Sequence, residues 1–169
     1  WENRRLILVY LIPIEFFYGK LPTTGNGLLE TYKLGMYNTF ANSIVLGRIH
    51  VFDRSLRENQ ILLIKLGIYQ LLASARKLVY FQILKASYQQ FGSDRMPSQV
   101  FQQALNIKDN FDENDYDDDE LDNEEYTIDE AENIVAVLIK MKLIKAYIHH
   151  RLHFIVFGKE PFQPLSIYE

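Results

Sequence analysis

Three histidines near the end of the chain are the residues whose type and spacing first suggest chemistry. His149, His150 and His153 lie within five positions, and imidazole is the commonest metal ligand in proteins. The apolar runs on either side predict two strands joined at these histidines, so that His149 and His150 would point to opposite faces. No carboxylate stands near them at the spacing of a tetrahedral site. We therefore predict no bound metal, and exposed turn histidines that add partial positive charge.

A dense run of carboxylates could instead bind calcium or carry acid–base chemistry. Fourteen Asp and Glu residues and no Lys or Arg lie between Asp109 and Glu132. The best frame for a calcium loop starts at Asp115, but it puts Glu120 in place of the invariant glycine and Tyr126 in place of the bidentate glutamate. The mutual repulsion of these charges predicts a solvated, flexible insert over about residues 108–126. A site for a basic partner and weak cation binding are the alternatives.

Outside the acidic region the chain carries a net positive charge. The 169-residue chain has a net charge of -4, yet outside positions 109–132 it holds 18 basic and 8 acidic residues, a balance of +10. Basic side chains bind phosphates in a salt-dependent way, and an ordinary solvated surface is the alternative. Because no arginine-rich pattern for reading bases is present, we expect only weak sequence specificity. The candidate nucleic-acid-binding residues are Lys140, Lys142, Lys145, His149, His150, Arg151 and Lys159.

Signatures of catalysis are missing from the sequence. It has no cysteine, no Gly-x-Ser-x-Gly, no Gly-Lys-Ser/Thr and no His-Glu-x-x-His. We therefore predict no enzyme and no cofactor. The longest apolar run, Leu6 to Ile14, has nine residues, against about 20 for a membrane-spanning helix. We expect a buried helix there, with no membrane span and no signal peptide.

Apolar periodicity predicts a series of helices in the first half of the chain. Residues 6–17 form a helix buried on most sides and kinked or divided at Pro13. Further helices are predicted over 28–46, as one or two, and over 50–59. The clearest is a long amphipathic helix over 67–90. Because the chain enters this pattern without an initiator methionine, we expect it to begin inside a larger protein, after the first helices of the array.

The second half follows a different pattern. Pro97 and Ser98 open a short helix, with Ser98 as its cap or Pro97 in its first turn. Thr127 to Glu130 matches a capping box that starts a helix over about 129–141. Two short strands over 143–148 and 152–157 follow. The outline is that of a mainly α fold, a helical-repeat array followed by a winged helix. We predict the array over 1–92, the winged helix over 93–159 and a tail over 160–169.

Several stretches resemble the PCI domain, a helical-repeat array fused to a winged helix. The resemblance lies in Leu11 to Pro22, Leu28 to Leu34, Gly67 to Tyr80, Ile128 to Ile148 and Pro161 to Leu165. The last two stretches are similar to one branch, the Thp-type mRNA-export subunits and the signalosome-associated subunit of yeasts. Two departures are Ala146, where glycine is common, and the acidic insert, which puts a simple transfer of the nucleic-acid surface in doubt.

The resemblance implies a non-catalytic scaffold in the nucleus, with the cytoplasm as a second compartment. Such subunits pair with a Sac-type PCI protein, hold a small acidic, disordered Sem/Dss-type protein, and bind RNA or DNA without sequence specificity. This activity would couple transcription to mRNA processing and export. The alternative is a signalosome-associated subunit that supports cullin deneddylation by a separate catalytic subunit. Our partner-binding candidates are Arg76, Lys77, Lys85, Ile144 and Tyr147.

Overall fold

The computed structural model describes residues 2–22, 27–107, 125–164 and 166–168. The predicted flexible insert falls outside these ranges except for its last two residues, so its structure is not described. The chain divides into two compact units, Trp1–Gln82 with Pro164–Glu169, and Ile83–Gln163. No helix in the described ranges combines the length and apolar character that a membrane crossing needs.

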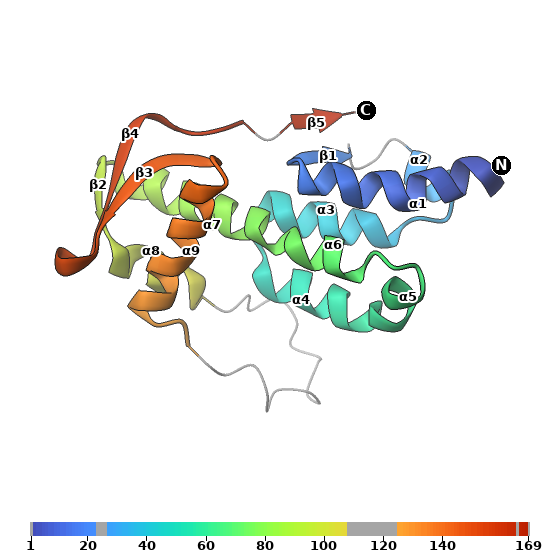
Figure 1. The fold of residues 1–169 in the computed structure, drawn as a ribbon, viewed down its shortest axis with the longest axis horizontal. Coiled ribbons are helices and arrows are strands. Elements are labelled where there is room, and N and C mark those ends of the chain that lie inside the picture. Colours follow the sequence, from blue (N-terminus) through green and yellow to red (C-terminus); the bar gives the residue numbers. More distant parts are fainter. Residues whose placement is uncertain (1, 23–26, 108–124, 165, 169) are drawn as a thin grey trace. The chain divides into compact units, whose positions relative to one another are not determined.

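The first unit is built mainly from helices of different lengths (Figure 1). Its core is aromatic: Phe16, Tyr37, Phe40 and Phe52 are fully buried. The Tyr37 hydroxyl donates to the backbone oxygen of Val9 at 2.8 Å, and burial raises the pKa of this phenol. The helices are α1 (Glu2–Phe17), α2 (Leu28–Thr31), α3 (Met36–Leu46), α4 (Ile49–Glu58), α5 (Gln60–Lys65), α6 (Tyr69–Ser74) and the start of α7 (Arg76–Phe91).

Two helix predictions in this unit need correction. The helix predicted over 67–90 is α6 and α7, divided at Ala75, although Ile68, Leu72 and Val79 are buried as the periodicity requires. The first helix is a single element that contains Pro13. It is not buried on most sides in this chain. Its exposed large apolar residues are Leu6, Ile7, Tyr10, Leu11, Ile14 and Phe17.

The C-terminal residues were predicted to be a tail, but they add a strand to the first unit. Strand β5 (Ser166–Tyr168) pairs in parallel with β1 (Lys20–Pro22). The two strands are separated by most of the chain, so no local sequence pattern predicts their pairing.

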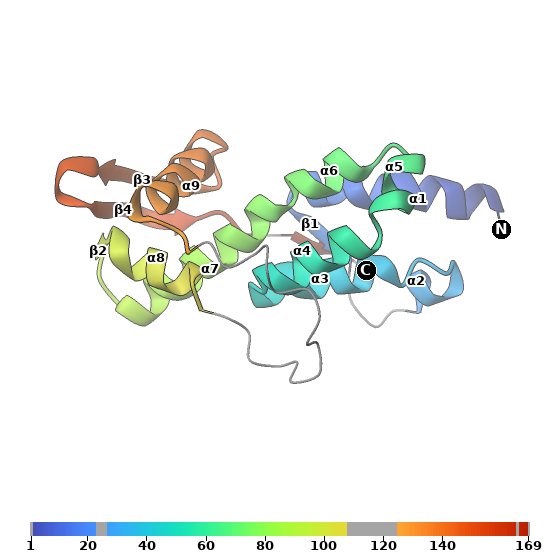
Figure 2. The same ribbon diagram turned by 90° about the horizontal axis from the view of Figure 1, so that it is seen from below.

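The second unit is a winged helix. After the rest of α7 come β2 (Arg95–Pro97), α8 (Ser98–Leu105) and α9 (Ile128–Lys140). The wing follows, comprising β3 (Ile144–His149), the 3-10 turn η1 (His150–Leu152) and β4 (Phe154–Phe162). The sheet is antiparallel in the order β2-β4-β3. Figure 2 shows β3 and β4 side by side, with α9 next to them. The predicted fold class, mainly helical with a small C-terminal sheet, is confirmed.

Local sequence determines where the elements of the second unit lie. Apolar residues at helical spacing on α8 and α9 face the sheet and are buried, among them Phe101, Leu105, Val135 and Leu138. On β3 the side chains alternate, with Ile144 buried and Lys145, Tyr147 and His149 exposed. The wing is thus apolar on the core side and polar outside, and it holds its turn against the first turns of α9.

Candidate functional site

The turn of the wing brings two histidines together. His150 begins η1 and His153 follows it, and side chains at i and i+3 of a 3-10 turn eclipse one another. Their ring centroids lie 5.5 Å apart. His153 has φ 52°, a left-handed backbone that is uncommon and costly for a residue with a Cβ. His153 in this conformation lies between η1 and β4.

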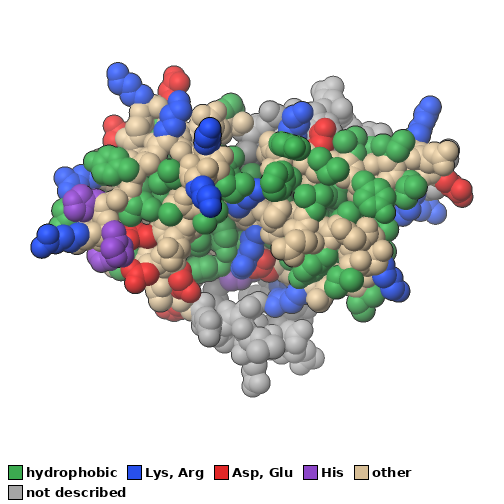
Figure 3. All heavy atoms as spheres, viewed as in Figure 1, with side chains coloured by type: hydrophobic (Ala, Val, Ile, Leu, Met, Phe, Trp, Pro, Cys, Tyr) green, Lys and Arg blue, Asp and Glu red, His purple; other side chains and the backbone are tan. Residues whose placement is uncertain are grey.

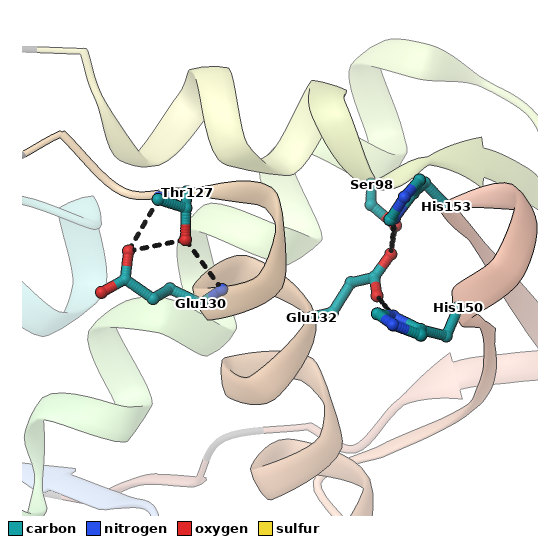
Figure 4. Close-up of polar contacts among 6 residues, drawn as sticks. All are labelled: Ser98, Thr127, Glu130, Glu132, His150 and His153. Carbon is teal, nitrogen blue, oxygen red and sulfur yellow. Dashed lines mark hydrogen bonds and ion pairs between the residues drawn. The ribbon is translucent and has the colours of Figure 1, made fainter.

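The Glu132 carboxylate forms a hydrogen bond with each of the two histidines. It lies on α9 and is only 4% exposed. Nδ1 of His150 lies 2.5 Å from its Oε2, and Nδ1 of His153 lies 3.0 Å from its Oε1 (Figure 4). Because an ionised carboxylate can only accept hydrogen bonds, both imidazoles carry the proton on Nδ1. An unpartnered buried carboxylate would be costly, and here each of its oxygens has a partner.

Ser98 completes the contacts of Glu132 from a third element. Its hydroxyl donates to Oε1 of Glu132 at 2.7 Å, and its backbone N–H donates to the carbonyl of His153 at 2.8 Å. The sequence predicts either Ser98 as the cap of this helix or Pro97 in its first turn. Pro97 occupies the cap position instead, with no side-chain cap bond, because the Ser98 hydroxyl is turned toward α9. The residue therefore connects α8, α9 and the wing.

The electrostatics of this group favour charged side chains. Burial would raise the pKa of Glu132, but the hydrogen bonds from His150, Ser98 and His153 outweigh burial and leave its pKa below the ordinary value. The hydrogen bond to Glu132, with the Coulombic attraction of the same carboxylate, raises the pKa of His150. A protonated His150 beside an ionised Glu132 is the pair that these shifts favour.

A second carboxylate lies beside the first. Ligand atoms from Asp129, Glu132, His150 and His153 all lie within 4.8 Å of one another. The expectation that no carboxylate accompanies the histidines is therefore wrong: Asp129 and Glu132 are three apart on one helix face, and folding brings that face to the wing turn. We name these four residues the histidine–carboxylate cluster. His149 lies outside it.

The predicted capping box fixes the start of α9 and hence the positions of both carboxylates. The N–H of Glu130 donates to Oγ1 of Thr127 at 3.3 Å, and the N–H of Thr127 donates to Oε2 of Glu130 at 2.8 Å (Figure 4). These bonds satisfy amides that the first helical turn leaves open. The Thr127 N–H and hydroxyl both donate to the Glu130 carboxylate and lower its pKa. The prediction is confirmed.

The two ends of the acidic insert are joined just before this box. The N–H of Tyr126 donates to Oδ1 of Asn106 at 2.8 Å, and Nδ2 of Asn106 donates back to the Tyr126 carbonyl at 3.1 Å. Nε2 of Gln102 donates to the same carbonyl at 2.9 Å. This clamp holds the end of α8 against the start of α9 through residues outside the acidic run 109–125.

The predicted basic residues are exposed around the wing. Figure 3 shows Lys and Arg side chains spread over this face of the molecule, and histidines with acidic side chains beside them. His150 differs from the others because its ring contacts Glu132. We name the remaining six the basic wing set. They are Lys140, Lys142, Lys145, His149, Arg151 and Lys159, all exposed.

The sequence comparisons identify the family. The PCI domain family matches residues 56–159 of the chain, a range that includes α7, the winged helix up to Lys159 and the whole histidine–carboxylate cluster. The chain belongs to the PCI domain family. This is a scaffold-type family whose members assemble into multi-subunit complexes with other PCI proteins.

The relatives of this PCI domain protein are longer. A PCI domain-containing protein 2 homolog of Caenorhabditis briggsae is 34% identical over 94% of this chain and 35% of its own length. The homolog of Drosophila melanogaster is 31% identical over 98% and 38%. COP9 signalosome complex subunit 12 of Kluyveromyces lactis is 24% identical over 98% and 40%. The chain thus spans little more than a third of the length of the relatives named first.

The five partner-binding candidates occupy different places in the PCI domain. Arg76 pairs with Asp53 at 2.5 Å, and Nζ of Lys77 lies 3.9 Å from the centre of the Phe17 ring. Burial lowers the pKa of Lys77. These two residues belong to the first unit, and the other three belong to the winged-helix unit.

The three candidates in the winged-helix unit differ in exposure. Tyr147 is 60% exposed and Lys85 is half-buried. Ile144 is 2% exposed. It is the first buried position of β3 and belongs to the core of its own unit, so its partner-binding role stays a prediction that its burial does not favour.

Proposed function

We propose that this PCI domain is a non-catalytic scaffold that binds a second PCI protein and presents its basic wing set to nucleic acid. The observation that carries the proposal is the exposure of six basic side chains around the wing of a PCI winged helix. Phosphate contacts by Lys and Arg fix orientation without reading sequence. The binding expected is therefore sensitive to salt and weakly specific.

The proposed setting is a nuclear complex that couples transcription to mRNA processing and export. The relatives named PCI domain-containing protein 2 are 34% and 31% identical to the chain, against 24% for the signalosome subunit, and this difference supports the first setting over the second. The proposed protein partners are a Sac-type PCI protein and a small acidic, disordered Sem/Dss-type protein. A body with a balance of +10 outside the acidic region suits an acidic partner.

A second candidate function is that of a signalosome-associated subunit. The Kluyveromyces lactis relative, whose name places it in the COP9 signalosome, favours this alternative. There the chain would position a separate deneddylating subunit, and nucleic acid would play no part.

Purification of the full-length protein from its own cells, followed by identification of stoichiometric partners, separates the two. Recovery of a Sac-type PCI protein with a small acidic protein supports the first proposal. Recovery of the core signalosome subunits instead would replace it with the second. A charge-neutral variant of the exposed Lys65, remote in sequence from the wing, serves as a control that tagging and substitution alone do not change the partners.

A further inference from the structure

The histidine–carboxylate cluster has the composition of a metal site. Two imidazoles and two carboxylates come from α9 and from the wing turn, with ligand atoms within 4.8 Å of one another. Among the residues that the structure describes, this is the only group of three or more such side chains. None of its four members belongs to the basic wing set, although Arg151 lies between the two histidines in the same turn.

Hydrogen bonding alone explains only part of the arrangement. Glu132 is satisfied by Ser98, His150 and His153, and Asp129 in the first turn is favoured by the helix dipole. Neither effect requires the Asp129 carboxylate to converge with two imidazoles. A dication at this point would be neutralised by both carboxylates and would use every member of the cluster.

Two features hold the cluster in advance of binding. His153 has a left-handed backbone at φ 52°, and residues held in such sparsely populated conformations concentrate at functional sites. Ser98 orients the Glu132 carboxylate through its hydroxyl and the His153 backbone through its N–H. Ligating carboxylates in metal sites are commonly fixed by such outer hydrogen bonds.

We propose that Asp129, Glu132, His150 and His153 bind one first-row transition-metal dication, with Zn²⁺ as the probe. Imidazole with carboxylate suits zinc and its neighbours, whereas calcium and magnesium take oxygen ligands. Two ligands on one tetrahedral zinc lie about 3.4 Å apart, so the Nδ1–oxygen distances of 2.5 and 3.0 Å must widen if these atoms ligate. The two Nδ1 protons must then be released to solvent, because a ligating imidazole nitrogen is unprotonated. His150 and His153 can move outward, since their side chains are 73% and 47% exposed.

Metal binding at this place would join the wing turn to the first turns of α9. Anything that binds the folded chain and not the unfolded chain stabilises it. The bound ion would therefore stiffen the turn that carries Arg151, and it would raise the temperature at which the winged helix unfolds.

Isothermal titration of the tag-free chain with zinc chloride tests the proposal. We expect one Zn²⁺ per chain, a higher melting temperature, and visible absorption typical of a His/carboxylate site when Co²⁺ replaces zinc. His150→Ala and His153→Ala should each weaken binding at least about tenfold. His149→Ala, a histidine outside the cluster, is the matched control and should bind as the parent does.

Two further variants keep the result decisive. Asp129→Asn changes an exposed side chain and should weaken zinc binding while circular dichroism shows an unchanged fold. Deletion of residues 109–125 removes 11 carboxylates outside the cluster, and should leave the zinc affinity unchanged. Absence of binding, binding that survives the double variant His150→Ala/His153→Ala, or loss of binding on the deletion would each overturn the proposal.

Discussion

Ser98 donates its hydroxyl to Glu132 across two helices, at 2.7 Å, and thereby connects the first residue of α8 with the fifth of α9. Both residues are buried. The same serine holds the His153 carbonyl through its backbone N–H. The relationship matters because it locks the wing turn onto the helices that support it.

Removal of this hydroxyl should destabilise the winged helix. Ser98→Ala leaves Oε1 of Glu132 with His153 as its remaining partner, and loss of a hydrogen bond to a buried charged group costs about 1–3 kcal/mol. Urea denaturation followed by circular dichroism measures the free energy of unfolding. Ser93→Ala, at an exposed position, is the control. Equal stability of the two variants would contradict the role assigned to Ser98.

The capping box provides a second, local prediction. Thr127→Ala removes the acceptor of the Glu130 N–H and should lower the free energy of unfolding by about 1 kcal/mol. Because Thr127 and Glu130 act on each other, a double-mutant cycle should show a non-zero coupling energy. Thr39→Ala, on the exposed side of α3, should change little. Additive effects of the Thr127 and Glu130 substitutions would show that the box does not act as a unit.

The stability that the capping box contributes should depend on pH, because an ionised Glu130 accepts its two hydrogen bonds more strongly. The Thr127 N–H and hydroxyl lower the pKa of this carboxyl from its ordinary 4.5. A carboxyl with a lowered folded pKa stabilises the protein above its unfolded pKa, and this stabilisation is lost as pH falls through the folded pKa. The difference in unfolding free energy between the parent and Glu130→Ala should therefore shrink from neutral to acidic pH. Urea titrations in EDTA measure it, and a difference independent of pH would refute the ionic contribution.

Deletion of the acidic insert should leave the fold intact. Removing residues 109–125 takes away 11 carboxylates and changes the net charge from -4 to +7. The Asn106–Tyr126 clamp lies outside the deletion and keeps the ends of α8 and α9 together. We expect an unchanged circular dichroism spectrum and tighter binding to heparin, eluted at higher salt. Loss of folding would show that the insert is structural.

Local patterns sufficed for the elements that local chemistry determines. Thr127 and Glu130 announce the start of α9 because a capping box needs only four residues. The helical spacing of Ile68, Leu72 and Val79 also predicted that these residues are buried. This spacing does not predict the division of α6 from α7 at Ala75, because the apolar periodicity continues across the break.

The cluster was hidden for a different reason. His150 and Glu132 are 18 positions apart, and His153 and Glu132 are 21 apart, so only the folded winged helix brings them together. The strand-turn-strand prediction considered only the strand face to which each histidine points. It did not consider contacts between the histidines and the helix that precedes the strands. The i, i+3 spacing of Asp129 and Glu132 was the one signal available. The parallel pairing of β1 with β5 had no local signal at all.

The central claim, that a PCI winged helix presents a basic wing to nucleic acid, is tested most directly by the salt dependence of RNA binding. The full-length protein with its copurified partners is titrated into a short fluorescent single-stranded RNA, and the triple variant Lys145→Glu/Arg151→Glu/Lys159→Glu is compared with the parent. The control variant Arg4→Glu/Lys20→Glu/Lys65→Glu changes the net charge equally at exposed sites in the first unit.

We predict that the wing variant loses at least about tenfold in affinity near 0.1 M salt, and that its slope of log affinity against log salt falls by about 2. The control variant should lose far less. RNA binding by the wing variant with the affinity and slope of the parent would contradict the account.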